Sequence, residues 1–233
     1  MHYLEAVVAI IFIVCVVNGF RKGFLRMVLS FGTLAIAFVI TMFGYHHVAK
    51  VLNQYTGFSD AVQTQVAKTL ELDTNKDVEK RAIQIKKINN LPLPETIIQG
   101  LNDSNNEEIY EALKVNTFNE YLAKYLAVIV SNSAAFLITY LLAYLLLKAL
   151  MALVDMITEL PIIHGINKIG GVLLGGLEGV LLIWLTFLVI NIISGSGIGQ
   201  TLLIWIKESK YLSILYDNNI IMDGIINLSN ILF

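Results

Sequence analysis

The chain has 233 residues, of which 56% are hydrophobic and 15% are charged, and its mean hydropathy is +0.70. Water-soluble domains are closer to half apolar and a quarter charged, so this composition indicates an integral membrane protein. The formal net charge of -2 argues against binding of nucleic acid, which needs an excess of Lys and Arg. The single cysteine, Cys15, argues against a disulfide framework and a cysteine-based metal site.

Four apolar segments are candidates for membrane spans, because crossing about 30 Å of hydrocarbon at about 1.5 Å per residue takes about 20 residues. We predict spans at about 3–20, 24–44, 122–150 and 172–193. The first is the shortest and carries Glu5 near its start. A cleaved signal peptide is the alternative there, but the basic residues follow this apolar run instead of preceding it. The predicted fold class is all-α, with about four transmembrane helices arranged as two helical hairpins.

Lys and Arg in the short loops predict the orientation of the spans, because cytoplasmic loops carry an excess of positive charge. Arg21 and Lys22 lie in the turn after the first span, and Lys148 and Lys168 lie in the loop before the fourth. Two crossings separate these loops, so both fall on the same side of the membrane. We therefore expect both loops in the cytoplasm and both termini outside.

The segment between the two hairpins, residues 45–121, is polar enough to form a soluble extracytoplasmic insert made of short helices. Ser59 and Asp60 are candidates to cap a helix that places Val62 and Val66 on one face. The insert separates a first transmembrane hairpin, residues 1–44, from a second transmembrane hairpin, residues 122–193.

Residues 194–233 follow the fourth span and begin with a Gly/Ser hinge. Trp205, Tyr211 and Tyr216 are of the types that prefer the interface between lipid and water. We predict an interfacial amphipathic tail, in which residues 200–216 form a helix on the outer membrane surface. A helix docked over the external insert is the alternative, and the sequence leaves both open.

Small residues spaced by four allow two helix backbones to approach closely, which is the main source of attraction between helices in lipid. Gly171, Gly175 and Gly179 form such a stripe at the start of the fourth span, and Gly19 and Gly23 form a pair beside the first turn. We predict that these five residues pack helices together. These glycines pack against another helix of the same chain, form the contact between copies in a homo-oligomer, or line a pore.

Arg26 and Glu178 lie inside the second and fourth predicted spans. Charges within a bilayer are costly and commonly mark function. The two side chains are therefore candidates for an intramembrane charge pair. Solvation by lipid headgroups is the alternative, because a long basic side chain near a helix end can extend to the interface.

The sequence shows no pattern typical of an enzyme or a metal site. His46 and His47 are adjacent and lack the i, i+4 spacing of a zinc-binding helix, and His164 accompanies no nucleophile motif. The second, third and fourth predicted spans carry few polar side chains, which is a thin set for an ion path: Ser30, Thr33, Ser131, Asn132, Ser133, Thr139 and Thr186. We predict no enzymatic activity, no metal and no cofactor.

Three short motifs occur in order along the chain: Gly19-Phe20-Arg21-Lys22-Gly23-Phe24, then Leu91-Pro92-Leu93-Pro94, then Leu160-Pro161 followed by Asn167 and Gly170-Gly171-Val172-Leu173-Leu174-Gly175. With these motifs the chain, up to about residue 195, resembles the colicin V production protein (CvpA) family of bacterial inner-membrane proteins. The resemblance implies a four-span protein without catalytic activity that supports production or export of a peptide toxin and maintenance of the cell envelope.

The expected partners are the lipid bilayer, a second copy of the chain, and an unidentified membrane or secretion protein. The alternative function is a small transporter or channel, in which glycine-lined helices of several subunits surround a pathway. Solute flux across a reconstituted membrane distinguishes the two functions.

The orientation of the first span can be tested with an epitope tag fused before Met1. The positive charge after the first span should keep the C-terminal end of this span in the cytoplasm, which places the N-terminal end outside. We therefore expect a membrane-impermeant reagent to label the tag from outside intact spheroplasts. Labelling of the tag only after the membrane is opened would reduce the number of crossings to three.

Overall fold

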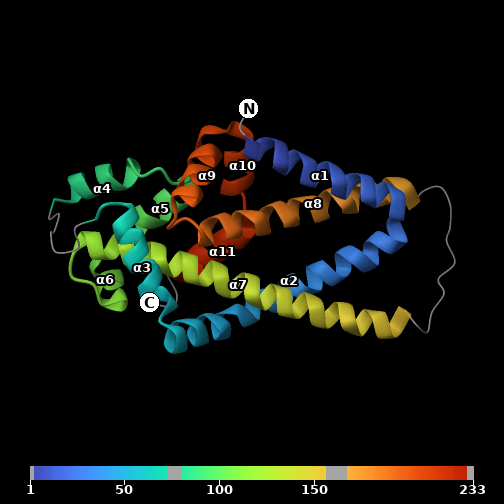
Figure 1. The fold of residues 1–233 in the computed structure, drawn as a ribbon, viewed down its shortest axis with the longest axis horizontal. Coiled ribbons are helices and arrows are strands. Elements are labelled where there is room, and N and C mark those ends of the chain that lie inside the picture. The colour runs from blue at the N-terminus through green and yellow to red at the C-terminus, as the bar shows by residue number, and fades with distance from the viewer. Residues whose placement is uncertain (1–2, 73–79, 156–166, 230–233) are drawn as a thin grey trace.

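The computed structural model describes residues 3–72, 80–155 and 167–229 (Figure 1). In these ranges the chain forms helices and no strands. Four helices are long and apolar enough to cross a membrane: α1 (Tyr3–Lys22), α2 (Phe24–Thr56), α7 (Phe118–Asp155) and α8 (Asn167–Ile192). The all-α membrane fold that the sequence predicts is confirmed.

A single residue, Gly23, joins α1 to α2 and has a φ of 76°. Residues with a β-carbon rarely adopt a positive φ, so glycine allows the chain to reverse here without strain. Hydrogen bonds continue through the turn, because Gly23 N donates to Gly19 O (2.9 Å) and Met27 N donates to Gly23 O (3.0 Å).

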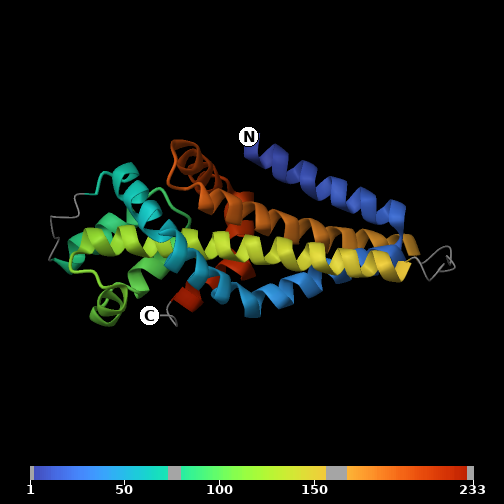
Figure 2. The same ribbon diagram turned by 60° about the horizontal axis from the view of Figure 1, so that its bottom comes forward.

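The four long helices pack mainly with partners from the other hairpin. Along the bundle, α1 lies against α8 and α2 lies against α7, whereas α1 and α2 diverge from their common turn (Figures 1 and 2). Helix α8 also contacts both α2 and α7. Helix α8 is therefore the centre of the bundle, and the two hairpins hold each other in place.

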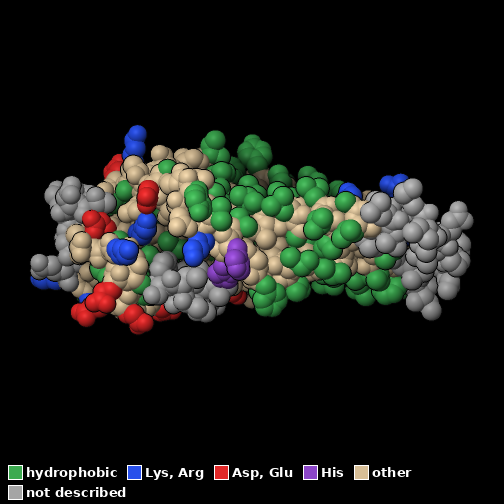
Figure 3. All heavy atoms as spheres, turned by 90° about the horizontal axis from the view of Figure 1, so that it is seen from below, with side chains coloured by type: hydrophobic (Ala, Val, Ile, Leu, Met, Phe, Trp, Pro, Cys, Tyr) green, Lys and Arg blue, Asp and Glu red, His purple; other side chains and the backbone are tan. Residues whose placement is uncertain are grey.

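The surroundings of α7 change along its length. Most side chains between Phe118 and Phe136 are buried in protein. Beyond that point the exposed fractions of four leucines are 56–64%: Leu141, Leu142, Leu145 and Leu146. Figure 3 shows the same division on the surface, with apolar side chains over the bundle and charged ones at the opposite end. The half of the molecule that contains the Gly23 turn is therefore the part whose surface suits a bilayer, and the first half of α7 belongs to the other part, which we call the extramembrane domain.

Four short helices gather around the first half of α7: α3 (Phe58–Thr69), α4 (Arg81–Asn89), α5 (Glu95–Asp103) and α6 (Glu107–Leu113). Tyr121 of α7 donates a hydrogen bond from its hydroxyl to the carbonyl oxygen of Leu101 in α5 (2.7 Å). Lys87 of α4 donates to Asn119 Oδ1 of α7 (2.7 Å). The beginning of α7 is thus the core of this extramembrane domain.

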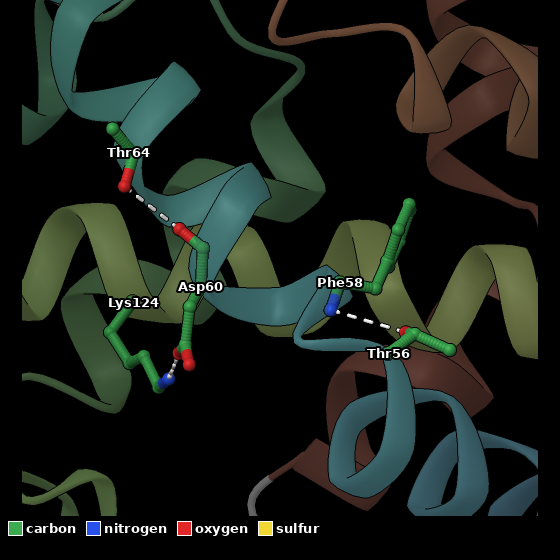
Figure 4. Close-up of polar contacts among 5 residues, drawn as sticks. All are labelled: Thr56, Phe58, Asp60, Thr64 and Lys124. Atoms are coloured by element: carbon green, nitrogen blue, oxygen red, sulfur yellow. Dashed lines mark hydrogen bonds and ion pairs between the residues drawn. The ribbon is translucent and has the colours of Figure 1, made fainter.

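The corner between α2 and α3 is built on Gly57, whose φ is 61°. The predicted capping by Ser59 and Asp60 is wrong, because α3 begins at Phe58 and both residues lie in its first turn. Asp60 instead forms an ion pair with Lys124 of α7 at 3.1 Å (Figure 4). The apolar face that the spacing predicted for α3 does pack into the core.

The tail forms three helices that dock onto the rest of the protein: α9 (Gly197–Glu208), α10 (Lys210–Asp217) and α11 (Ile220–Ser229). Tyr216 has no exposed surface, and its hydroxyl donates to Asn191 Oδ1 of α8 (2.7 Å). Trp184 of α8 donates from its indole nitrogen to the carbonyl oxygen of Leu215 (3.1 Å). These buried contacts correspond to the docked alternative for this segment.

One side of the tail also meets the start of α1. The rings of Tyr3 and Trp205 lie 6.4 Å apart, and the exposed fractions of Tyr211 and Ile198 are 75% and 72%. Aromatic and aliphatic side chains exposed at the outer end of a span suit the interfacial region of a bilayer. The tail is therefore docked on one face and has apolar residues on the other.

The division of α7 predicts different effects for two leucine substitutions. Leu122 has no exposed surface, so Leu122→Ala should lower the free energy of unfolding by about 2–5 kcal/mol through the cavity it leaves. Leu142 is 62% exposed, so Leu142→Ala should change the free energy of unfolding by about 0.5 kcal/mol or less. Denaturant titration of the purified protein in detergent measures both. Equal losses would contradict the assignment of the first half of α7 to the extramembrane core.

Candidate functional site

The glycine stripe of α8 faces α1. A β-carbon added at Gly175 would lie 2.5 Å from the carbonyl oxygen of Cys15, and one added at Gly171 would collide with the carbonyl oxygen of Gly19. A β-carbon at Gly19 would in turn collide with the carbonyl oxygen of Gly171. The two backbones touch where these residues meet, and only glycine leaves the necessary space.

The remaining two predicted packing glycines lie at either end of this contact. The Cα of Gly23 would be 3.0 Å from a β-carbon added at Gly171. A β-carbon at Gly179 would be 3.0 Å from the ring of Phe12 and 3.3 Å from the side chain of Cys15. All five glycines therefore lie along one helix pair, and in this structure α1 covers the stripe.

The structure does not bring Arg26 and Glu178 together. Arg26 is exposed on α2 and Glu178 is half-buried on α8, and no ion pair joins them within the described ranges. The cation whose charge reaches Glu178 is Lys22, at the end of α1. Tyr140 of α7 also lies within electrostatic range of this carboxylate. Groups of α1 and α7 are thus electrostatic neighbours of Glu178.

The basic residues that set the predicted orientation lie at one end of the bundle: Arg21, Lys22, Lys148 and Lys168. Lys168 Nζ is 5.1 Å from the ring centre of Phe20, and Lys148 Nζ is 5.8 Å from that of Tyr144. The positive-inside rule requires such an arrangement. His164 and the Leu160-Pro161 motif lie outside the described residues.

The polar run 131–133 lies deep inside the protein. Ser131, Asn132 and Ser133 are at most 2% exposed, and the two hydroxyls and the Asn132 side-chain nitrogen have no hydrogen-bond partner. The hydroxyls of Tyr45 and Tyr140 are buried without partners as well. Most buried polar groups in proteins are paired, so an unpaired group marks a position where a ligand or another polar group can bind.

An open groove of about 610 Å³ lies beside one of these unpaired groups. Its lining residues come from α2 and α7: His46, His47, Ala49, Lys50, Asn53, Gln54, Val128 and Asn132. Two of these residues, Asn132 and Asn53, each have a buried side-chain atom without a hydrogen-bond partner, Nδ2 and Oδ1 respectively. None of the described residues that line it is acidic. We call this feature the α2–α7 groove.

The α2–α7 groove lies at the boundary of the apolar surface. In Figure 3 the histidine side chains are found where the apolar surface gives way to charged groups. The pair His46 and His47, predicted at a span boundary, thus helps to form a binding-sized groove. Sequence reasoning missed the groove because Asn132 comes from a distant helix, although its polar type inside an apolar segment was a usable signal.

A second cavity lies between α3, α7, α8 and α9 and measures about 30 Å³. Its lining is mainly apolar and includes Val66, Leu126 and Leu203, with Asn191 at its edge. It has room for about one water molecule and is too small for a substrate. In the described part of the chain, no three His, Cys, Asp or Glu side chains come together as metal ligands. Because the α2–α7 groove is the larger of these two cavities and has unpaired polar groups beside it, we take it as the candidate functional site.

The family model described as Colicin V production protein matches residues 4–70 and 113–219. The matched residues contain nearly all of the four long helices and every residue that lines the α2–α7 groove, whereas the unmatched residues 71–112 contain α4, α5 and most of α6. No curated protein and no solved structure matches the chain.

The contact between α1 and α8 predicts a strong difference between two glycine substitutions. Gly175→Ala should lower the free energy of unfolding by about 1–3 kcal/mol, because the new methyl group forces two backbones apart. Gly32→Ala is the matched control, since a β-carbon there meets nothing within 4 Å. It should be neutral or stabilising by up to about 1 kcal/mol. Denaturant titration in detergent compares them, and similar effects at the two sites would contradict this contact.

Proposed function

The chain belongs to the colicin V production protein family, and from this premise we propose a non-enzymatic membrane protein that supports export of a colicin V-like bacteriocin and maintenance of the cell envelope. The family match supports a role in colicin V production. The four long apolar helices make the chain an integral membrane protein.

The observation that carries the proposal is the continuity between the membrane bundle and the extramembrane domain. Helices α2 and α7 run without a break from one into the other, and α3 and the tail pack against them and α8. A partner that binds the extramembrane domain is thereby connected rigidly to the spans. This architecture suits a protein that positions other components at a membrane.

The extramembrane domain also offers surface for such a partner. Tyr55 at the end of α2 is 78% exposed, and Ile83 of α4 is 51% exposed. These two side chains mark exposed apolar positions at which a partner can be sought, since binding surfaces commonly include such residues. We propose that the unidentified secretion or envelope partner contacts this domain.

We place the protein in the bacterial cytoplasmic membrane, with both termini and the extramembrane domain outside. The four basic residues at the opposite end of the bundle support this orientation, because positive charge is retained on the cytoplasmic side.

A transporter or channel is the second candidate, and the observation in its favour is the unpaired polar run 131–133, which lies where α7 leaves the bilayer. Solute flux into proteoliposomes tests this function directly. Flux that Asn132→Leu abolishes while the fold is retained would support transport. Substitution of Gly175 is unsuitable for this purpose, because it disturbs the contact between α1 and α8.

Site-specific photocrosslinking in bacteriocin-producing cells tests the proposed function. A photoreactive residue at position 55 or 83 should form discrete adducts with a component of the secretion machinery, because both side chains are exposed on the extramembrane domain. Position 142, which is 62% exposed and faces lipid, is the matched control and should give no protein adduct.

The adducts should disappear in cells that lack the bacteriocin export genes, and deletion of the chain should reduce secreted toxin. Identical adducts at positions 55 and 142, or normal toxin secretion without the chain, would contradict the proposed function.

A further inference from the structure

We propose that the α2–α7 groove binds an anionic phospholipid, with the headgroup phosphate held between Lys50, His47 and Asn132. The lipid belongs to the leaflet next to the extramembrane domain. This site is independent of the role in toxin export, because it follows from the groove and the surface around it.

The charge of the groove suits a phosphate. Lys50 contributes a full positive charge, and His46 and His47 add ring nitrogens that can donate hydrogen bonds. None of the described lining residues is acidic, so no nearby carboxylate competes for these donors. Basic pockets between transmembrane helices at the level of the headgroups are a recurring way to bind anionic lipids.

The unpaired amide groups supply the more specific part of the site. Asn132 lines the groove and is 2% exposed, and its buried side-chain nitrogen has no acceptor. A buried donor without an acceptor is unfavourable, and rotation of the Asn132 side chain toward the groove would let it donate to a phosphate oxygen. Asn53 Oδ1 is the complementary unpaired acceptor, suited to a headgroup hydroxyl. A phosphate that carries a hydroxylated headgroup, as in phosphatidylglycerol, matches this pair.

The exposed face of α2 indicates a lipid in preference to free phosphate. Ile36, Ile40 and Phe43 are 53%, 46% and 79% exposed and follow one another at helical spacing. His47 and Lys50 continue the same face and are also exposed. A molecule on this face therefore meets apolar side chains along one part and basic ones beyond it. Only an amphiphile, with acyl chains below and a phosphate above, is complementary to both parts.

The size of the groove is consistent with a headgroup. Ligand pockets commonly measure about 300–1,000 Å³, and the α2–α7 groove has about 610 Å³. The lipid would extend the contact between α2 and α7 at the level where both helices leave the bilayer.

Native mass spectrometry of the full-length protein tests the proposal, with phosphatidylglycerol and phosphatidylethanolamine added at equal concentrations. The double variant His47→Gln/Lys50→Gln should lower the fraction bound to phosphatidylglycerol at least fivefold. The matched control Lys68→Gln/Lys86→Gln removes two exposed charges from α3 and α4 and should change that fraction by less than twofold. The wild-type protein should bind phosphatidylglycerol more tightly than phosphatidylethanolamine.

A second pair of variants tests the buried amide. Asn132→Leu should also weaken retention of phosphatidylglycerol, whereas Ser133→Ala, which removes an equally buried and unpaired hydroxyl outside the groove lining, should not. Circular dichroism of each variant verifies the fold, and the exposed double variant decides the question if Asn132→Leu does not fold.

Unchanged retention in the double variant, or equal binding of the two lipids, would overturn the proposal. Displacement of the bound lipid by millimolar inorganic phosphate would assign the groove to soluble phosphate and would also overturn it. Loss of the lipid site with normal toxin secretion would leave the proposed function intact, so the two can fail separately.

Discussion

At 33 and 38 residues, α2 and α7 are about 50 and 57 Å long, whereas the hydrocarbon core of a bilayer is about 30 Å thick. Both helices must therefore continue outside the membrane, and they leave it side by side. The extramembrane helices assemble on these extensions, as the hydrogen bond from Tyr121 to Leu101 illustrates. The excess length thus explains why the domain and the bundle form one connected structure, and why a groove occurs between α2 and α7 where they emerge.

The bundle depends in turn on close approach of α1 and α8. Lipid provides no hydrophobic drive for pairing of two apolar helices, so attraction comes from contacts that only small residues permit. Gly19, Gly171 and Gly175 bring the two backbones together, which fixes the first helix to the centre of the bundle. The tail then fixes the other end of α8 through Tyr216 and Asn191. Helix α8 is held at both ends, so it can serve as a fixed support for α2 and α7.

Hydropathy alone could not distinguish the two halves of α7. Leu122 and Leu142 lie in the same apolar segment, yet one is enclosed by protein and the other is 62% exposed. Burial in a soluble core and contact with lipid select the same residue types, so the predicted span at 122–150 includes both environments. The α2–α7 groove escaped prediction for a related reason, because His47 and Asn132 become neighbours only when α2 packs against α7.

The sequence by itself determined the helical membrane class, the four long apolar helices and the family, because length, hydropathy and short motifs are local properties of the chain. It also identified Gly171 and Gly175 as packing residues, although not their partner. Only the tertiary structure decided that α1 is that partner, that Arg26 and Glu178 form no ion pair, and that the buried Asn132 helps to line a basic groove. Each of these depends on which helices pack together, and the energy of packing arises between residues distant in the chain.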